Sequence, residues 1–191
     1  MIDLKTPIEV SAKHLHLCQE HVDILFGKNY QLTNKRELSM KGYYVTEETV
    51  EVVGKKGSAN FSILVPLRSQ SQVEIAITDA IKLGLDQHIR ESGDLEGSGS
   101  CLLKGPQGEV TLSQGVIIAA RHIHMNTKMA EENNLKSGDY VNVLVEGARA
   151  LVFNKVLIRT DDNFDITMHI DTDEGNAANL NNKKIFYGKI F

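Results

Sequence analysis

Short runs in which hydrophobic and polar residues alternate recur along most of the chain, and they predict β-strands. Runs that alternate or are rich in β-branched residues, and that end at Gly, Pro, Asn or Asp, are typical of strands. These runs are PIEVSA, YYVTEETVEVVG, ANFSILVPL, SQVEIAIT, GSCLLKGPQGEVTLSQGVIIAA, DYVNVLVEG, ALVFNKVLIR and FDITMHI. Many short strands with few helices indicate small barrels or a sandwich.

Helical periodicity is weaker and is confined to short segments. CQEHVDILFG and TKMAEENNLKSGD each end near a Gly, a residue that favours the end of a helix, and TDAIKLGL is a shorter candidate. KGPQGEV predicts the turn of a β-hairpin, in which Gly105, Pro106 and Gly108 supply the turn dihedrals. The expected fold class is therefore mainly β, with short helices beside the strands.

Two segments of the chain resemble each other at a constant offset of 108 residues, since His14 aligns with His122 and His16 with His124. IEVSAKHLHLCQEHVDILFG aligns with VIIAARHIHMNTKMAEENNL, and both predict a strand, a His-x-His word and a short helix. A small residue and a cation precede the histidines in both words. We interpret this as an internal duplication, with a domain boundary near residue 118.

The paired histidines are candidates for metal ligands. On a strand, residues i and i+2 point to one face about 6–7 Å apart, so both rings of a pair can reach one ion. His14 and His16 would share a face while Leu15 points into a core, and His122 and His124 would do the same. A single pair could equally consist of surface or capping histidines, but two pairs in matching contexts favour metal binding.

A zinc site needs further ligands, because catalytic zinc usually takes three from the protein. His169 follows a predicted strand and precedes a polar, Asp- and Gly-rich turn, where it could also bond to a neighbour. Glu74 lies inside an apolar strand, where a carboxylate is costly unless it is paired, metal-bound or facing solvent. Arg68 precedes it by six residues, hence on the same face of a regular strand, and arginine is a natural partner of phosphate or carboxylate.

Composition limits the function classes. The 191 residues suffice for one large domain or two small ones, and 41% of them are hydrophobic. A net charge of −4 with scattered Lys and Arg argues against nucleic-acid binding. The two cysteines make no disulfide framework, and neither a secretory signal nor a run long enough to span a bilayer is present. We therefore expect a cytoplasmic protein without a membrane partner.

Four stretches together resemble the phosphate propanoyltransferase family, the phosphotransacylases of the propanediol-utilisation type. They are VSAKHLHL, LRSQSQVEIAITDA, AARHIHM and MHIDTDEGNA, and the resemblance runs from about Ile8 to the C-terminus. It implies two small β-barrels with short capping helices and a di-metal active site between them. The first barrel would span 13–118 and the second 119–191, with a strand from 1–12 added to the second.

The resemblance also implies site residues. One zinc would be held by His14, His16 and Glu74, and the other by His122, His124 and His169, although another divalent metal could occupy such sites. Arg68 matches the phosphate-binding and catalytic arginine of the family. The residues that match positions near coenzyme A are Val10, Ser11, Ala12, Lys55 and Asn176.

The activity implied is reversible transfer of an acetyl or propanoyl group between coenzyme A and phosphate, by direct zinc-assisted displacement. The sequence departs from the family at Lys13, where arginine is common, at Cys18, where serine is common, and at LVPL, where Gly-Pro is common. No microcompartment-targeting extension is visible ahead of His14. A homodimer is a working expectation, and an acyl kinase is expected to use the acyl phosphate.

Two other functions stay open on the sequence alone. A zinc-dependent thioester hydrolase would use the same ligands to activate water, although the amidohydrolase barrels that carry His-x-His need about 250 residues. A non-catalytic module could use zinc only for stability, but six protein ligands for two metals would leave coordination positions open.

Overall fold

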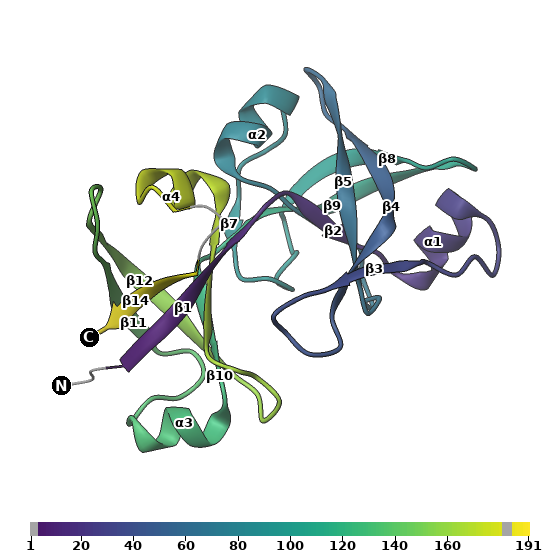
Figure 1. The fold of residues 1–191 in the computed structure, drawn as a ribbon. Helices are drawn as coiled ribbons and strands as arrows, with labels where there is room; N and C mark the ends of the chain where they lie inside the picture. Colours follow the sequence, from purple (N-terminus) through teal and green to yellow (C-terminus); the bar gives the residue numbers. More distant parts are fainter. Residues whose placement is uncertain (1–3, 181–184) are drawn as a thin grey trace. The chain divides into compact units, whose positions relative to one another are not determined.

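The protein forms two compact units in a computed structural model that describes residues 4–180 and 185–191 (Figure 1). Unit 1 takes its described residues from segments 1–11, 39–41 and 120–191, and unit 2 from segments 12–38 and 42–119. Both are built mainly from strands, as the alternating runs predict. None of the described helices is long and apolar enough to cross a membrane.

Unit 2 is a closed barrel of six strands. The ring runs β4-β5-β2-β6-β9-β8 and returns to β4, with β3 beside β4 and β7 beside β9. The strands are β2 (His14–His16), β3 (Asn34–Glu37), β4 (Tyr44–Val53), β5 (Ser58–Val65), β6 (Gln72–Glu74), β7 (Ile89–Arg90), β8 (Gly99–Lys104) and β9 (Glu109–Ala119). Two helices accompany them, α1 (Gln19–Phe26) and α2 (Ile77–Leu83).

Unit 1 is a second closed barrel of six strands, in the order β1-β13-β10-β12-β11-β14. The strands are β1 (Leu4–Ser11), β10 (His122–Met125), β11 (Tyr140–Val145), β12 (Leu151–Thr160), β13 (Thr167–Asp171) and β14 (Phe186–Ile190). Its helices are α3 (Thr127–Glu132) and α4 (Thr172–Ala177). The predicted mainly β class with two small barrels and short helices is therefore confirmed.

Each barrel has its own hydrophobic core, built from the alternating positions of its strands. In β11, Val141, Val143 and Val145 are buried while the residues between them are less so. In β8, Cys101 and Leu103 point into the other core in the same way. Because successive side chains point to opposite faces of a strand, every second residue is buried in the barrel, and the residues between them are available on its outer face for polar side chains.

The two barrels share one topology. β2 pairs in parallel with β5 and antiparallel with β6, and β10 pairs in parallel with β12 and antiparallel with β13. The strands that carry the candidate third ligands, β6 with Glu74 and β13 with His169, also have equivalent neighbours. β6 pairs in parallel with β9, and β13 pairs in parallel with β1. The same neighbours in the same directions support the interpretation of an internal duplication.

The strand that leads into each His-x-His word belongs to the other barrel. β1 runs into β2 along the chain, yet its ladder partners are β13 and β14 of unit 1. β9 runs into β10, yet it pairs with β6, β7 and β8 of unit 2. The equivalent strands β1 and β9 are therefore exchanged between the two halves of the chain, and the barrel of unit 1 closes only by joining β1 to strands from the C-terminal part.

One predicted turn is a helix. The polar segment after His169 was expected to be an Asp- and Gly-rich turn, but residues 172–177 form α4. Asp171 accepts a hydrogen bond from the backbone of Glu174, whose side chain accepts one from the backbone of Asp171. This capping box stabilises the first turn of a helix, which explains why the expectation was wrong.

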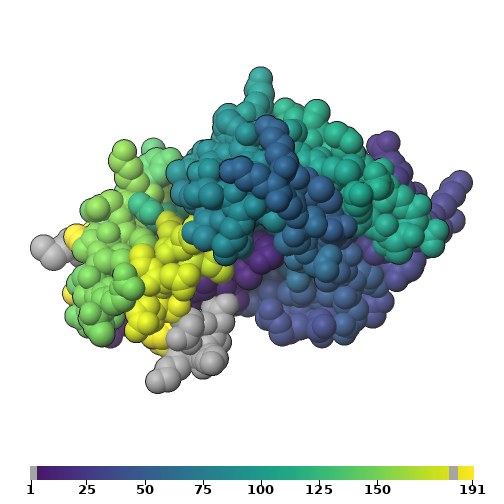
Figure 2. Space-filling model, turned by 90° about the horizontal axis from the view of Figure 1, so that it is seen from above, coloured from purple at the N-terminus to yellow at the C-terminus, as the bar shows by residue number. Residues whose placement is uncertain are grey.

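The hairpin turn between β8 and β9 is confirmed, but its glycines serve a different purpose from the one expected. Neither Gly105 nor Gly108 has a positive φ. Instead, a Cβ at Gly105 would lie less than 3.0 Å from the backbone oxygen of Leu25 in α1. Figure 2 shows the teal hairpin packed directly against purple α1. Close approach of a helix, rather than turn dihedrals, requires glycine here.

We expect Gly105→Ala to destabilise the protein by about 1–3 kcal/mol, because the added methyl group meets backbone that cannot move aside cheaply. Gly57→Ala is the matched control. Gly57 closes the equivalent turn of the β4–β5 hairpin, where a Cβ would make ordinary contacts. Urea unfolding of both variants measures the difference, and equal stabilities would show that the contact with α1 is unimportant.

Candidate functional site

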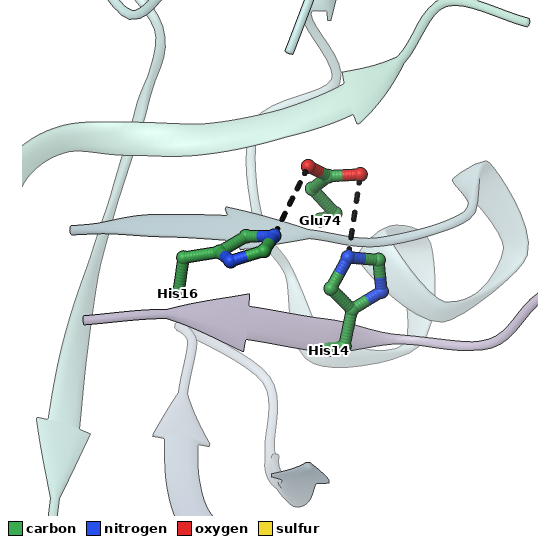
Figure 3. Close-up of side chains that lie close together, drawn as sticks. All are labelled: His14, His16 and Glu74. Carbon is green, nitrogen blue, oxygen red and sulfur yellow. Dashed lines mark ion pairs between the residues drawn. The ribbon is translucent and has the colours of Figure 1, made fainter. Parts of the chain in front are cut away.

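Three side chains of unit 2 that could bind a metal come together on two adjacent strands. His14 and His16 project from one face of β2, and Glu74 projects from β6 (Figure 3). The antiparallel register places His14 directly opposite Glu74. One nitrogen or oxygen atom from each side chain lies within 4.8 Å of the others. Leu15 is fully buried on the opposite face of β2, as the i, i+2 spacing predicts.

The hydrogen bond of His14 selects the nitrogen that faces the cluster. Its Nδ1 lies 2.8 Å from the carbonyl oxygen of Ala12, so Nδ1 carries the proton and donates it. The other nitrogen, Nε2, then has a lone pair and lies 3.4 Å from Oε2 of Glu74. Nε2 of His16 lies 3.9 Å from Oε1 of the same carboxylate. A neutral imidazole fixed by a backbone carbonyl is the usual form of a metal-binding histidine.

Both titratable ligand types are held in their metal-binding protonation states. Burial, together with the nearby charge of Arg68, lowers the pKa of His16 to about 3. Burial opposes ionisation of Glu74, but its surroundings, His14, His16, Arg68 and the hydroxyl group of Ser92, outweigh it and lower the pKa of the carboxyl group. Since metals bind neutral imidazole and ionised carboxylate, the three residues fit a divalent ion such as zinc.

Ser92 and Gln72 connect Glu74 to Arg68 through a hydrogen-bond network in which the donor and the acceptor of every bond are defined. Ser92 Oγ donates to Glu74 Oε1 at 2.9 Å, and it accepts from Arg68 Nη1 and from Gln72 Nε2, both at 3.0 Å. Gln72 Nε2 also donates to Glu74 Oε1 at 2.5 Å, while its Oε1 accepts from the backbone of Gly93. Two donors on Oε1 fix the carboxylate so that Oε2 faces His14 while Oε1 remains the oxygen nearer His16.

The sequence analysis did not identify Ser92 or Gln72. Gln72 carried a usable signal, because it shares the face of Glu74 on the same short strand and is buried. Ser92 had none, since it lies in the irregular segment that follows β7 and reaches Glu74 only through the tertiary fold. The expectation that Arg68 and Glu74 share one regular strand was wrong, because Arg68 lies between β5 and β6.

A second cluster lies on the corresponding strands of unit 1. His122 and His124 come from β10 and His169 from β13, and the register again sets the first histidine opposite the third residue. Their ring centroids are 4.7, 4.8 and 5.3 Å apart. Nδ1 of His122 lies 2.9 Å from the carbonyl oxygen of Ala120, which repeats the bond of His14. Phe164 packs on His124 at 4.2 Å between centroids.

Each cluster is accompanied by an ion pair in an equivalent place. Lys13, directly before His14, lies 3.4 Å from Asp79, five residues after Glu74. Arg121, directly before His122, lies 2.7 Å from Glu174, five residues after His169. The shared cation of the two words therefore pairs with an acid on the helix that follows each third-ligand strand. These pairs fix the start of each His-x-His strand against its neighbouring helix.

The positions matched to coenzyme A divide between the two units. Val10 and Ser11 belong to β1 of unit 1, where α4 approaches so closely that a Cβ at Gly175 would lie 2.9 Å from Val10. Asn176 is exposed on α4, so it shares this corner of unit 1 with Val10. Ala12 and Lys55 are exposed in unit 2. The structure therefore brings together Val10, Ser11 and the helix of Asn176.

Cys18 lies outside the three-residue group of unit 2. Its thiol lies 3.6 Å from Ser71 Oγ, which also accepts the backbone N–H of Cys18 and lies 2.7 Å from Nδ1 of His21. His21 is half-buried and bonded to this hydroxyl group. Ser71 thus anchors the start of α1 beside the cluster.

Comparisons with known proteins give one consistent family. Residues 7–181 match the family model described as phosphate propanoyltransferase. A phosphate propanoyltransferase of Lachnoclostridium phytofermentans is 51% identical over 176 residues, which cover 91% of this chain and 82% of the relative. One of Thermotoga maritima is 47% identical over 182 residues, with coverages of 94% and 87%. One of Listeria monocytogenes is 41% identical over 191 residues, with coverages of 100% and 89%.

The family expected from the four sequence stretches is thus confirmed by matches that extend over most of the chain. This chain belongs to the phosphate propanoyltransferase family and is an acyltransferase.

Proposed function

We propose that the protein transfers a short acyl group, acetyl or propanoyl, reversibly between coenzyme A and inorganic phosphate. The observation that carries this proposal is the network from Arg68 through Ser92 to Glu74. This network connects Arg68, a side chain suited to bind phosphate, to the carboxylate of Glu74, which is one of the candidate metal ligands. A family of phosphate acyltransferases requires that combination, because phosphate must be held where the thioester is activated.

We propose that each cluster holds one zinc ion. His14, His16 and Glu74 would bind one ion, and His122, His124 and His169 the other. A zinc with an open position acts as a Lewis acid towards oxygen and can also accept sulfur. Histidine and carboxylate ligands also suit cobalt or manganese, so the metal that fills the sites in the cell depends on supply as well as affinity.

The protein's own groups hold and orient phosphate. The guanidinium of Arg68 binds two phosphate oxygens through parallel N–H donors, and Ser92 fixes its plane by accepting from Nη1. A phosphate oxygen then attacks the thioester carbon, the C–S bond breaks, and coenzyme A leaves as the thiolate. Holding both reactants in place contributes several kcal/mol of the rate enhancement.

Direct attack by phosphate agrees with the state of the cysteines. Burial raises the pKa of the Cys101 thiol to about 12, so this group stays protonated and unreactive at neutral pH. Cys18 is half-buried beside Ser71 rather than in the three-residue group. We therefore assign no acyl-enzyme intermediate to either thiol.

We propose that coenzyme A binds at Val10, Ser11, Ala12, Lys55 and Asn176. The close approach of α4 to β1 supports the part of this site in unit 1, because it places the helix of the exposed Asn176 against half-buried Val10. Lys55 is exposed in the turn between β4 and β5, where its charge suits a phosphate group of the cofactor. An acyl kinase would then use the acyl phosphate.

The first prediction concerns phosphate and metal dependence. We expect thiol release from acetyl-CoA or propanoyl-CoA to require phosphate, to stop on chelation and to return with zinc. The measurement follows free thiol together with bound metal. Release without phosphate would instead indicate a thioester hydrolase. Two bound metals without any turnover would leave only a zinc-stabilised binding module.

The second prediction concerns Arg68. We expect Arg68→Ala to reduce kcat/KM for phosphate on the order of 100-fold, because a charged clamp on the attacking group is lost. The KM for acyl-CoA should change little. Arg149→Ala is the control, since Arg149 is exposed in the turn between β11 and β12. Equal losses for phosphate and acyl-CoA would contradict a specific phosphate role.

The third prediction concerns Ser92. We expect Ser92→Ala to reduce kcat/KM for phosphate about 10-fold, because hydrogen bonds to charged groups contribute about 1.5–3 kcal/mol. Metal affinity should fall as well, since Glu74 loses one of the donors that orient it. Ser98→Ala is a control, because Ser98 bonds only backbone atoms in the described part of the chain. Unchanged phosphate kinetics in Ser92→Ala would contradict the coupling.

A further inference from the structure

We propose that Glu9 is a positioning residue for His169 and that it strengthens metal binding by the histidine cluster of unit 1. This inference rests on the proposed function, because it needs that cluster to hold a metal. Glu9 was not among the candidate site residues, and it lies on β1, which precedes the first His-x-His word. It reaches His169 only because β1 pairs with β13.

The strand register sets Glu9 beside His169. The two residues are direct partners in the parallel ladder, so their side chains leave the same face of the barrel. On the neighbouring positions Ile8 and Met168 point into the core together, which leaves Glu9 and His169 on the outer face. Oε2 of Glu9 lies 3.7 Å from Nδ1 of His169.

The carboxylate faces the ring nitrogen that a backbone carbonyl binds at two other histidines, at the longer distance of an ion pair. Nδ1 of His14 bonds to the carbonyl of Ala12, and Nδ1 of His122 bonds to that of Ala120. Glu9 faces the same ring nitrogen of His169. A carboxylate on Nδ1 directs Nε2 to the metal and makes the imidazole a stronger donor than a neutral carbonyl does. His169 therefore has an anionic neighbour at Nδ1.

A second contact fixes the carboxylate itself. Ser39 Oγ donates to Oε2 of Glu9 at 2.5 Å. Ser39 lies between β3 and β4 of unit 2, yet segment 39–41 belongs to unit 1. The hydroxyl group holds Oε2 near the imidazole and limits the rotamers of a side chain that is 32% exposed. The chain thus supplies His169, Glu9 and Ser39 from three separate segments.

The test compares Glu9→Gln with the wild-type protein, each loaded with zinc. We expect the variant to lose one of its two zinc ions about 10–100-fold faster to a chromophoric chelator, the range typical of lost ligand supports. The other ion should leave at the wild-type rate. Cobalt-loaded protein should show a changed visible spectrum for one site, while thermal stability of the metal-free protein stays the same.

Glu51→Gln is the matched control. Glu51 also accepts from a serine, Ser58 Oγ at 2.5 Å, and it lies on β4 of unit 2 and is not one of the three clustered residues of that unit. Ser39→Ala should speed the release of the same zinc ion as Glu9→Gln, but by a smaller factor. It removes the hydrogen bond that fixes the carboxylate of Glu9 without removing the charge of that carboxylate. Zinc release that is identical in Glu9→Gln and Glu51→Gln would overturn the proposal.

Failure of this inference is distinguishable from failure of the metal centre. Wild-type protein that binds two zinc ions, and His122→Ala that binds one, would establish the unit 1 site independently of Glu9. Under that result, unchanged release from Glu9→Gln rejects the positioning role alone. Wild-type protein that binds fewer than two ions rejects the site and the positioning role together.

Discussion

The antiparallel pairing of a His-x-His strand with the strand of the third residue is the constraint on which both candidate metal sites depend. It sets His14 opposite Glu74 and His122 opposite His169. Because side chains alternate along a strand, a shift of one residue would turn the outward-facing ligands into the core. Leu15 and Ile123 prevent that shift, since each is fully buried between two histidines. Core packing therefore fixes ligand geometry.

The duplicated frame carries two different donor sets. The equivalent third position is Glu74 in unit 2 and His169 in unit 1, so a divalent ion would leave a net charge of +1 in the first site and +2 in the second. The more positive site is the stronger Lewis acid and favours anionic ligands more. Glu9 reduces this difference from outside, because its charge lies beside His169 without being one of the three clustered residues. Divergence after duplication thus changed charge while keeping topology.

Local patterns predicted the elements well, but they could not reveal contacts made by tertiary folding. Alternation and turn residues identified the strands and the mainly β class, and the two His-x-His words indicated a duplicated frame. Ser92 and Glu9 escaped notice because each reaches its partner only through the tertiary fold: Glu9 lies across a strand pairing from His169, and Ser92 reaches Glu74 from the irregular segment after β7. The helix after His169 was missed because its polar residues resemble a turn, and only the reciprocal capping bonds distinguish the two. Gly105 was identified correctly as part of a turn, but for a reason that only the nearby helix supplies.

Under the proposed function, the network around Ser92 would couple phosphate binding at Arg68 to metal binding at Glu74. A hydroxyl group has one hydrogen to donate, and here it goes to Glu74 while Arg68 and Gln72 donate to the oxygen. Reversing any one bond would set two donors or two acceptors against each other. A metal that draws charge from Glu74 would weaken the hydrogen bond that Ser92 donates to this carboxylate. A phosphate that moves Arg68 would change the hydrogen bond that Arg68 donates to Ser92. The carboxylate and the guanidinium both bond Oγ of Ser92, so under the proposed function a change at one of them would be transmitted to the other.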